Sequence, residues 1–160
     1  ENDYKAYMQK LADEEKARQA LEARTVDKVS PGEQQPETDH RMETDDSSKG
    51  NTEGIFFRDA QDGHYFSYLM QTKGETNLSL QLKFWGQDEW RTSEFDIYVN
   101  DKLLCSVNNS HRWRTTQFKT VDYEIPAEFV KGKKEVRVKF VAHKGKQVGQ
   151  IYGVRLVKNY

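Results

Sequence analysis

The sequence predicts an all-β protein, an antiparallel β-sandwich of jelly-roll type preceded by an N-terminal helix. First, residues 77–86 alternate between large apolar side chains on one face and Ser, Gln and Lys on the other, which is the period of a half-buried strand. Second, residues 136–140 repeat this alternation and supply an opposing apolar layer. Third, about eight such segments follow one another at intervals of roughly ten residues, with no helical pattern between them.

Composition divides the chain into three parts. Its 160 residues suffice for one ordinary domain. All eight Phe and all three Trp lie after residue 54, so we expect the sandwich and its core in residues 55–160. Residues 1–24 are expected to form a connector helix, and residues 25–54 an extended wrapping or linker segment.

The helix is predicted over residues 3–24, which contain no Gly or Pro and are rich in Ala, Glu, Lys and Gln. Its apolar stripe is thin: Tyr4, Tyr7, Met8 and Leu11 mark one face of the first half, and mainly alanines follow. A helix of this kind gains little by packing on its own domain. We therefore expect its partner to be an upstream domain that is missing from this chain.

Residues 25–54 are polar and irregular. The pair Pro31-Gly32 and the single Pro36 are expected to block both a helix and a central strand. Two interpretations stay open, a solvated linker and an ordered segment that wraps along the sandwich. The dense directional side chains of residues 32–40 favour wrapping, whereas residues 43–51 are expected to be mobile.

The strands follow in order, separated by turns and loops. Gly63 suits the left-handed conformation of a turn after the first strand, and Asn100-Asp101 suits a two-residue hairpin turn with positive φ. A long polar loop is expected at residues 108–117. The strands are predicted at residues 55–58, 64–70, 77–86, 95–99, 102–107, 118–125, 135–142 and 150–157.

The charge pattern argues against nucleic acid and membranes as partners. Net charge is −1, and the nine Lys and Arg of residues 131–160 mostly alternate with apolar residues or lie in turns, as on exposed sheet faces and edges. No stretch is long and apolar enough to span a bilayer. The lone cysteine, Cys105, excludes an internal disulfide. Its apolar surroundings in the sequence favour a small core residue over a nucleophile.

The chain carries no motif of a catalytic or metal centre. It has no His-Glu-x-x-His, no paired Cys, no phosphate-binding Gly-rich loop and no Gly-x-Ser-x-Gly elbow, and its four histidines are scattered. We therefore expect neither catalysis nor a cofactor. Ca²⁺ is the one ion left open, because Asp59 and Asp62 could help to hold it, although turn geometry explains the two residues equally well.

Two loops have the composition of a carbohydrate-binding surface, in which aromatic rings stack on a sugar and polar side chains hydrogen-bond its hydroxyls. If both loops project from one end of the sandwich, they form a groove with two indole walls. The alternative is that each Trp closes the end of the core or docks on the missing domain. The candidate residues are Trp85, Trp90 and Arg91 in the first loop and His111, Arg112 and Trp113 in the second.

Several stretches carry a family resemblance. They are residues 20–27 (Ala-Leu-Glu-Ala-Arg-Thr-Val-Asp), residues 31–37 (Pro-Gly-Glu-Gln-Gln-Pro-Glu) with Asp39 and His40, residues 58–60 (Arg-Asp-Ala) with Asp62-Gly63, and residues 65–68 (Tyr-Phe-Ser-Tyr). They resemble the C-terminal β-sandwich domain of glycoside hydrolase family 127, the β-L-arabinofuranosidases of gut Bacteroides-type bacteria. The ending, with residues 136–140, Gly149 and Gly153, also resembles that domain and, more loosely, the galactose-binding-like modules. The Gly-Glu-Gln-Gln-Pro-Glu segment is the most specific part.

In that family the catalytic glutamate, zinc site and cysteine nucleophile lie in an upstream (α/α) barrel, which is absent here. Cys105 matches none of those motifs, so no catalytic residue carries over. The resemblance implies a periplasmic or secreted parent protein that degrades polysaccharide, with the catalytic domain and a plant-type oligosaccharide as partners. Two functions stay open. One is a non-catalytic carbohydrate-binding accessory domain that supports the barrel, and the other is a structural domain that docks on the barrel without binding sugar.

Overall fold

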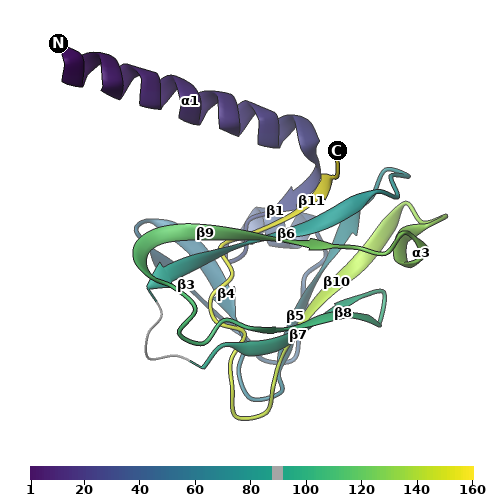
Figure 1. Cartoon of the computed structure of the whole chain (residues 1–160). Helices are drawn as coiled ribbons and strands as arrows, with labels where there is room; N and C mark the ends of the chain where they lie inside the picture. The colour runs from purple at the N-terminus through teal and green to yellow at the C-terminus, as the bar shows by residue number, and fades with distance from the viewer. Residues whose placement is uncertain (88–91) are drawn as a thin grey trace.

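The computed structural model describes residues 1–87 and 92–160, which form two stacked antiparallel sheets with a long helix at one side (Figure 1). The four-stranded sheet has the order β1 (Thr25–Val29), β11 (Gly153–Lys158), β6 (Leu78–Gln87) and β9 (Arg114–Glu124). The five-stranded sheet has the order β2 (Glu43–Thr44), β5 (Tyr65–Gln71), β10 (Glu135–Ala142), β7 (Glu94–Val99) and β8 (Lys102–Asn108). A hairpin of β3 (Ser48–Thr52) and β4 (Ile55–Asp59) lies beside them. The predicted all-β sandwich is confirmed.

The core lies between the inner faces of the two sheets, as the alternating sequence predicts. On β6, Leu80 and Leu82 are fully buried, and each stands opposite a buried residue of β11. On β10, Val138 and Phe140 are fully buried on the facing layer. Because side chains on a strand alternate between faces, the outer side of β6 carries Lys83 and the other polar residues of the run.

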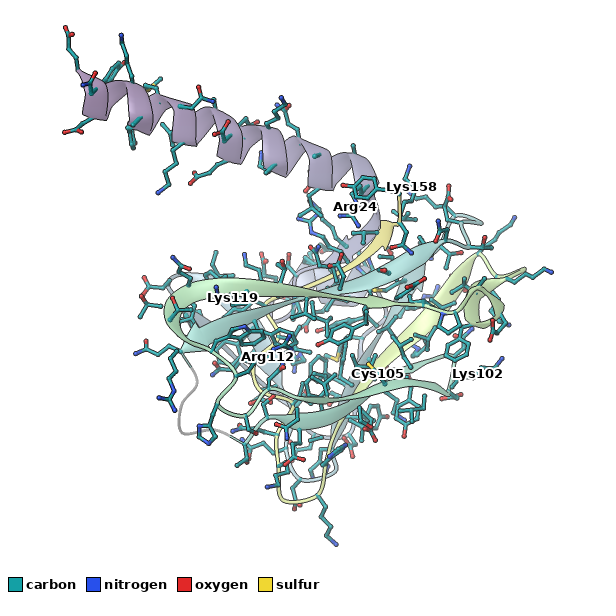
Figure 2. All side chains as sticks on the ribbon, viewed as in Figure 1. Arg24, Lys102, Cys105, Arg112, Lys119 and Lys158 are labelled. Atoms are coloured by element: carbon teal, nitrogen blue, oxygen red, sulfur yellow. The ribbon has the colours of Figure 1, made fainter. Side chains whose placement is uncertain are left out.

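The helix α1 (Asn2–Arg24) is confirmed, and it extends away from the sandwich with none of its residues buried (Figures 1 and 2). Only its C-terminal end is attached. Arg155 Nη1 lies 3.0 Å from Glu22 Oε1, and Arg24 Nε donates to the carbonyl oxygen of Lys158 at 3.0 Å (Figure 2). The expectation that α1 packs on an upstream domain stays a prediction.

Residues 25–54 are more regular than predicted. β1 adds an edge strand to the four-stranded sheet, and β2 and β3 occupy much of the stretch that was expected to be mobile. The expectation that Pro36 blocks a helix is wrong, because a short helix, α2 (Gln34–Asp39), contains it. Pro36 falls in the first turn, where a backbone N–H has no intrahelical acceptor and its loss costs nothing.

The segment Gly-Glu-Gln-Gln-Pro-Glu holds this region to the sandwich. Glu37 is buried and accepts hydrogen bonds from Arg58 of β4 and from the Tyr68 hydroxyl of β5, the latter at 2.6 Å. Burial alone would raise the pKa of Glu37, but the hydrogen bonds from Arg58 and Tyr68 outweigh it and lower the pKa. Gly32 has φ 84°, and a Cβ there would lie 2.6 Å from the carbonyl oxygen of Phe57. Only glycine therefore fits at this position.

Turns and loops agree with the sequence at most places. Gly63, Asn100 and Asp101 have positive φ, as predicted. The long polar loop is shorter than expected because β9 begins at Arg114. A helical turn, α3 (Ala127–Val130), lies within the turn before β10.

Candidate functional site

The described residues that flank the two candidate loops border one small cavity. Trp85, at the end of β6, and Trp113, just before β9, both line it, with Asn109 between them in the chain. Its volume is about 10 Å³, which is room for roughly one water molecule. The complete lining is Phe84, Trp85, Gly86, Ser93, Asn109, Trp113, Gly149 and Gln150. The described residues thus bring Trp85 and Trp113 to one cavity but leave only a narrow space there.

Trp85 lies on the outer face of the four-stranded sheet. Its half-buried ring meets the ring of Phe118 on the neighbouring strand β9 edge-on, with 4.8 Å between the centroids. The next residue, Gly86, allows the two strands to approach closely, because a Cβ there would lie 2.7 Å from Thr115 Cγ2 and 2.8 Å from the Gln117 carbonyl oxygen. A break in the strand register between Trp85 and Gln87 accompanies this approach.

Trp113, just before β9, packs on the inner side of the four-stranded sheet. Its ring centroid is 5.8 Å from that of Phe84, and it packs against the edge of the core. The guanidinium of Arg112 lies over this ring, with Cζ 4.6 Å from the centroid. A cation so placed is attracted by the π-face of the indole. Arg112 therefore holds Trp113 at the mouth of the cavity.

Asn109 carries the least satisfied polar group of the site. Its side chain is 6% exposed, and its Oδ1 accepts a hydrogen bond from Arg112 Nη1 at 3.1 Å. Its amide Nδ2 has no partner among the described residues. A buried donor left without an acceptor costs about 1–3 kcal/mol. The sequence places Asn109 in the second loop, but nothing in the sequence reveals that one of its donors is unpaired.

Hydrogen bonds fix the remaining wall of the cavity. The buried Asp59 Oδ1 accepts from the backbone N–H of Gly149 at 2.9 Å, and Ser93 Oγ donates to the carbonyl oxygen of Val148 at 2.7 Å. Asp62 has φ 49° and accepts from the backbone N–H of Gly145 at 2.7 Å. Both aspartates thus act in turns, and the prediction that they could help to hold Ca²⁺ stays untested.

The other candidates of the two loops are less constrained. His111 is exposed, with φ 58°. Trp90 and Arg91 lie outside the described residues, so their membership of the site stays a prediction. In residues 1–87 and 92–160, no three His, Cys, Asp or Glu side chains gather in a way that could hold a metal ion.

Cys105 lies on β8, half-buried against the core (Figure 2). Burial, together with the nearby charge of Asp96, raises the pKa of its thiol. A catalytic cysteine needs the opposite shift, toward the thiolate. This environment agrees with the small core residue that the sequence predicts.

Comparison with solved structures identifies the same fold in carbohydrate-binding modules. A family 35 module from an environmental isolate is 20% identical, with a TM-score of 0.55 over 71% of this chain and 81% of that one. A family 35 module from Clostridium thermocellum is 8% identical, with a TM-score of 0.58 over 82% and 98%. Both belong to a non-catalytic class of domain. A Podospora anserina β-(1,4)-mannanase that carries a family 35 module is 8% identical, with a TM-score of 0.56 over 83% of this chain and 27% of that chain.

At these identities the likeness concerns the fold alone. None of the helices in the described ranges has the length and apolar character needed to cross a lipid bilayer. No curated protein matches the sequence. A family of unknown function, DUF6805, matches residues 20–157, which include the last turn of α1 and all of the sandwich except the last residue of β11. The chain therefore belongs to the DUF6805 family.

Proposed function

We propose that this DUF6805 chain is a non-catalytic carbohydrate-binding accessory domain of a glycoside hydrolase. The observation that carries the proposal is the unpaired amide Nδ2 of Asn109, a buried residue at a cavity that Trp85 and Trp113 also line. A donor in that position favours an acceptor that arrives with a ligand, and carbohydrate-binding modules with this fold support a sugar as that ligand.

The size of the cavity indicates how a sugar binds. Because about 10 Å³ admits one oxygen atom and not a ring, one hydroxyl enters the cavity and accepts from Asn109. The sugar ring stays outside, beside the half-buried residues Trp85 and Trp113. Arg112, exposed beside Trp113, donates hydrogen bonds to the remaining hydroxyls.

The proposed setting is a longer secreted or periplasmic protein. The resemblance to glycoside hydrolase family 127 supports an (α/α) catalytic barrel as the partner, and an arabinose-containing plant oligosaccharide as the ligand. A solved enzyme in which a module of this fold accompanies a catalytic domain, the mannanase, supports the same arrangement. In that setting, the domain holds glycan close to the active site and increases its local concentration.

A titration with matched variants tests this proposal. Asn109→Asp keeps the oxygen that Arg112 contacts and removes the unpaired donor. Asn108→Asp makes the same change at an exposed neighbour, whose Oδ1 accepts a hydrogen bond from the backbone N–H of Ser110. With arabinan- and galactan-type oligosaccharides, Trp fluorescence of the wild type should change and saturate. Asn108→Asp should bind equally well and Asn109→Asp at least about tenfold more weakly. If Trp fluorescence of the folded wild type does not change up to millimolar sugar, the proposal is contradicted.

One observation favours the structural function as a second candidate. Tyr4, Tyr7, Met8 and Leu11 lie at the i, i+3, i+4 and i+7 positions of α1 and are 66%, 58%, 46% and 40% exposed. Large apolar groups in one stripe at helical spacing are typical of a surface that another protein segment covers. In this alternative the domain docks through α1 and stabilises the catalytic domain without touching sugar. Absence of sugar binding, together with protection of this stripe in the longer protein, would favour it.

A further inference from the structure

A groove of about 340 Å³ lies on the outer face of the four-stranded sheet, away from the loop cavity. Leu21 at the end of α1 and residues 28–30, at the end of β1, form one wall, and Ile55 of the β3–β4 hairpin forms another. The floor consists of outward-facing residues of β6, β9 and β11. Its volume suits a small ligand. It shares no lining residue with the cavity of the candidate site.

Lys83 lies along the floor of this groove. It stands opposite Gly153 on β11, where a Cβ would come within 3.3 Å of Lys83 Cβ and 3.7 Å of its Cδ. Glycine at this position therefore leaves space for the lysine stem. The ammonium Nζ lies 4.5 Å from the centroid of the Phe118 ring. The Phe118 ring packs in turn on the ring of Tyr152, with 5.0 Å between the two centroids. The charge thus lies above an aromatic surface.

Positive charge exceeds negative charge in this groove. Arg155 and Lys28 both pair with the same carboxylate, Glu22, at 3.0 and 3.2 Å. The lining itself contains three bases and a single acid, Glu33. In the described part of the chain, Lys83 has no carboxylate partner, although it is half-buried. Burial, with the charge of Arg155 as a smaller cause, lowers the pKa of Lys83. A half-buried cation without a counter-ion favours an anionic ligand.

The rest of the lining indicates what else the anion carries. Gln81 and Thr120 offer amide and hydroxyl groups on the floor, and Ser30 offers a hydroxyl at the wall. Tyr152 also lines the groove, but it is 3% exposed and its ring packs against Phe57 and Phe118. Side-chain hydroxyl and amide groups such as those of the floor and wall hydrogen-bond the hydroxyls of a sugar. An Arg fork or several free backbone N–H groups would favour a phosphate dianion, but the one arginine here, Arg155, is already bound to Glu22 and Thr25.

We propose that this groove is a second glycan site, selective for acidic sugar residues, in which Lys83 binds the carboxylate of a uronic acid. The site is independent of the loop cavity. A chain with both sites would hold a branched or acidic glycan at two points, and the two affinities would then reinforce each other.

Calorimetric titration of the 160-residue chain at low ionic strength tests the proposal with two probes, trigalacturonate and neutral galactotriose. Lys83→Met removes the charge and keeps an unbranched apolar stem. Lys139→Met is the matched control, because Lys139 Nζ lies 4.4 Å from the ring of Tyr65 on the opposite sheet. Trigalacturonate should bind the wild type. Its Kd should rise at least about tenfold in Lys83→Met, and stay unchanged in Lys139→Met and in Asn109→Asp. Lys83→Arg should retain binding and shows that charge, not stem length, is required.

Distinct results would overturn the proposal. Trigalacturonate that fails to bind the folded wild type, or that binds Lys83→Met as well as the wild type, excludes Lys83 as the anion-binding group. Equal loss in Lys83→Met and Lys139→Met indicates non-selective attraction to surface lysines. Inorganic phosphate that displaces trigalacturonate at equal concentration would contradict a sugar site. Loss of binding in Asn109→Asp alone assigns the acidic sugar to the loop cavity instead.

Discussion

Arg58 donates two parallel hydrogen bonds to Glu37, from Nε to Oε2 at 2.6 Å and from Nη2 to Oε1 at 2.8 Å. Both side chains are less than a tenth exposed. The pair joins α2 to β4 and fixes the segment between β1 and β2. A bidentate pair of this kind has geometric specificity as well as strength. It explains why so polar a stretch is ordered.

Removal of one partner of this pair should destabilise the fold strongly. Arg58→Met leaves the Glu37 carboxylate buried without its counter-charge, and we expect a loss of about 3–5 kcal/mol in the free energy of unfolding. Urea denaturation followed by circular dichroism measures this loss. Arg18→Met is the control, because Arg18 pairs with Glu15 on the exposed surface of α1 and should unfold like the wild type. Equal stability of the two variants would contradict a structural function of the buried pair.

The contact between His40 and Asp27 should make stability depend on pH. His40 Nδ1 lies 2.8 Å from the carbonyl oxygen of Pro36, and Nε2 lies 2.9 Å from Asp27 Oδ1. Both partners are acceptors, so both bonds form only when the ring is protonated. The hydrogen bond to Asp27 raises the pKa of His40 against the opposing effect of burial. Burial would raise the pKa of Asp27, but hydrogen bonds from His40 and Gln71 lower it.

The directions of the two pKa shifts define the pH range in which the contact between His40 and Asp27 stabilises the fold. The contribution of His40 is complete below its unfolded pKa of about 6.5 and is lost as pH rises through the higher folded value. The contribution of Asp27 is complete above its unfolded pKa of about 3.9 and is lost as pH falls through the lower folded value. The stability difference between wild type and His40→Gln should therefore be largest between these limits and shrink at alkaline pH. His64, which pairs with Asp45, is present in both proteins, so its contribution cancels from the stability difference. A difference that is constant with pH contradicts a protonated His40.

The packed interior should tolerate truncation poorly on β6. Leu82 is fully buried between the sheets, so Leu82→Ala should cost about 2–5 kcal/mol through lost burial and a cavity. Leu103→Ala is the control because Leu103 is 51% exposed on an edge strand, and its cost should stay below about 0.5 kcal/mol. Thermal and urea unfolding measure both. Similar costs at the two positions would mean that Leu82 is not in a tightly packed core.

Most of α1 should be dispensable for folding of the sandwich. None of its residues is buried, its attachment lies at Glu22 and Arg24, and the family match begins at residue 20. A chain that begins at residue 20 should therefore unfold cooperatively at the same denaturant concentration as the full chain. A large drop in the midpoint would show that residues 1–19 contact the sandwich in solution.

The strands after residue 54 could be predicted from the sequence because apolar and polar side chains alternate along several of them. Leu80 and Leu82 alternate with polar residues, and Asn100-Asp101 provides the backbone conformation that its turn needs. The order within residues 25–54 could not be predicted. It depends on Arg58 and Tyr68, which lie far along the chain from their partner Glu37. Tertiary contacts of this kind override local propensity.

The candidate site could be predicted in part. The two Trp loops were selected by composition, and Trp85 and Trp113 both line one cavity, although binding of a sugar there stays a prediction. Their orientation depends on strand register, since Phe84 points inward and Trp85 outward. The unpaired amide of Asn109 and the groove around Lys83 result from the way distant segments close on one another. No pattern in the sequence marks either feature.

The central claim is that Asn109 and the two indole rings form a sugar site, and nuclear magnetic resonance titration tests it most directly. In an assigned ¹⁵N-labelled chain, arabinan-type or galactan-type oligosaccharide should shift the Asn109 side-chain amide signals. The indole N–H signals of Trp85 and Trp113 should shift along the same binding curve. Shifts confined to other residues, or none up to millimolar oligosaccharide, would contradict the account.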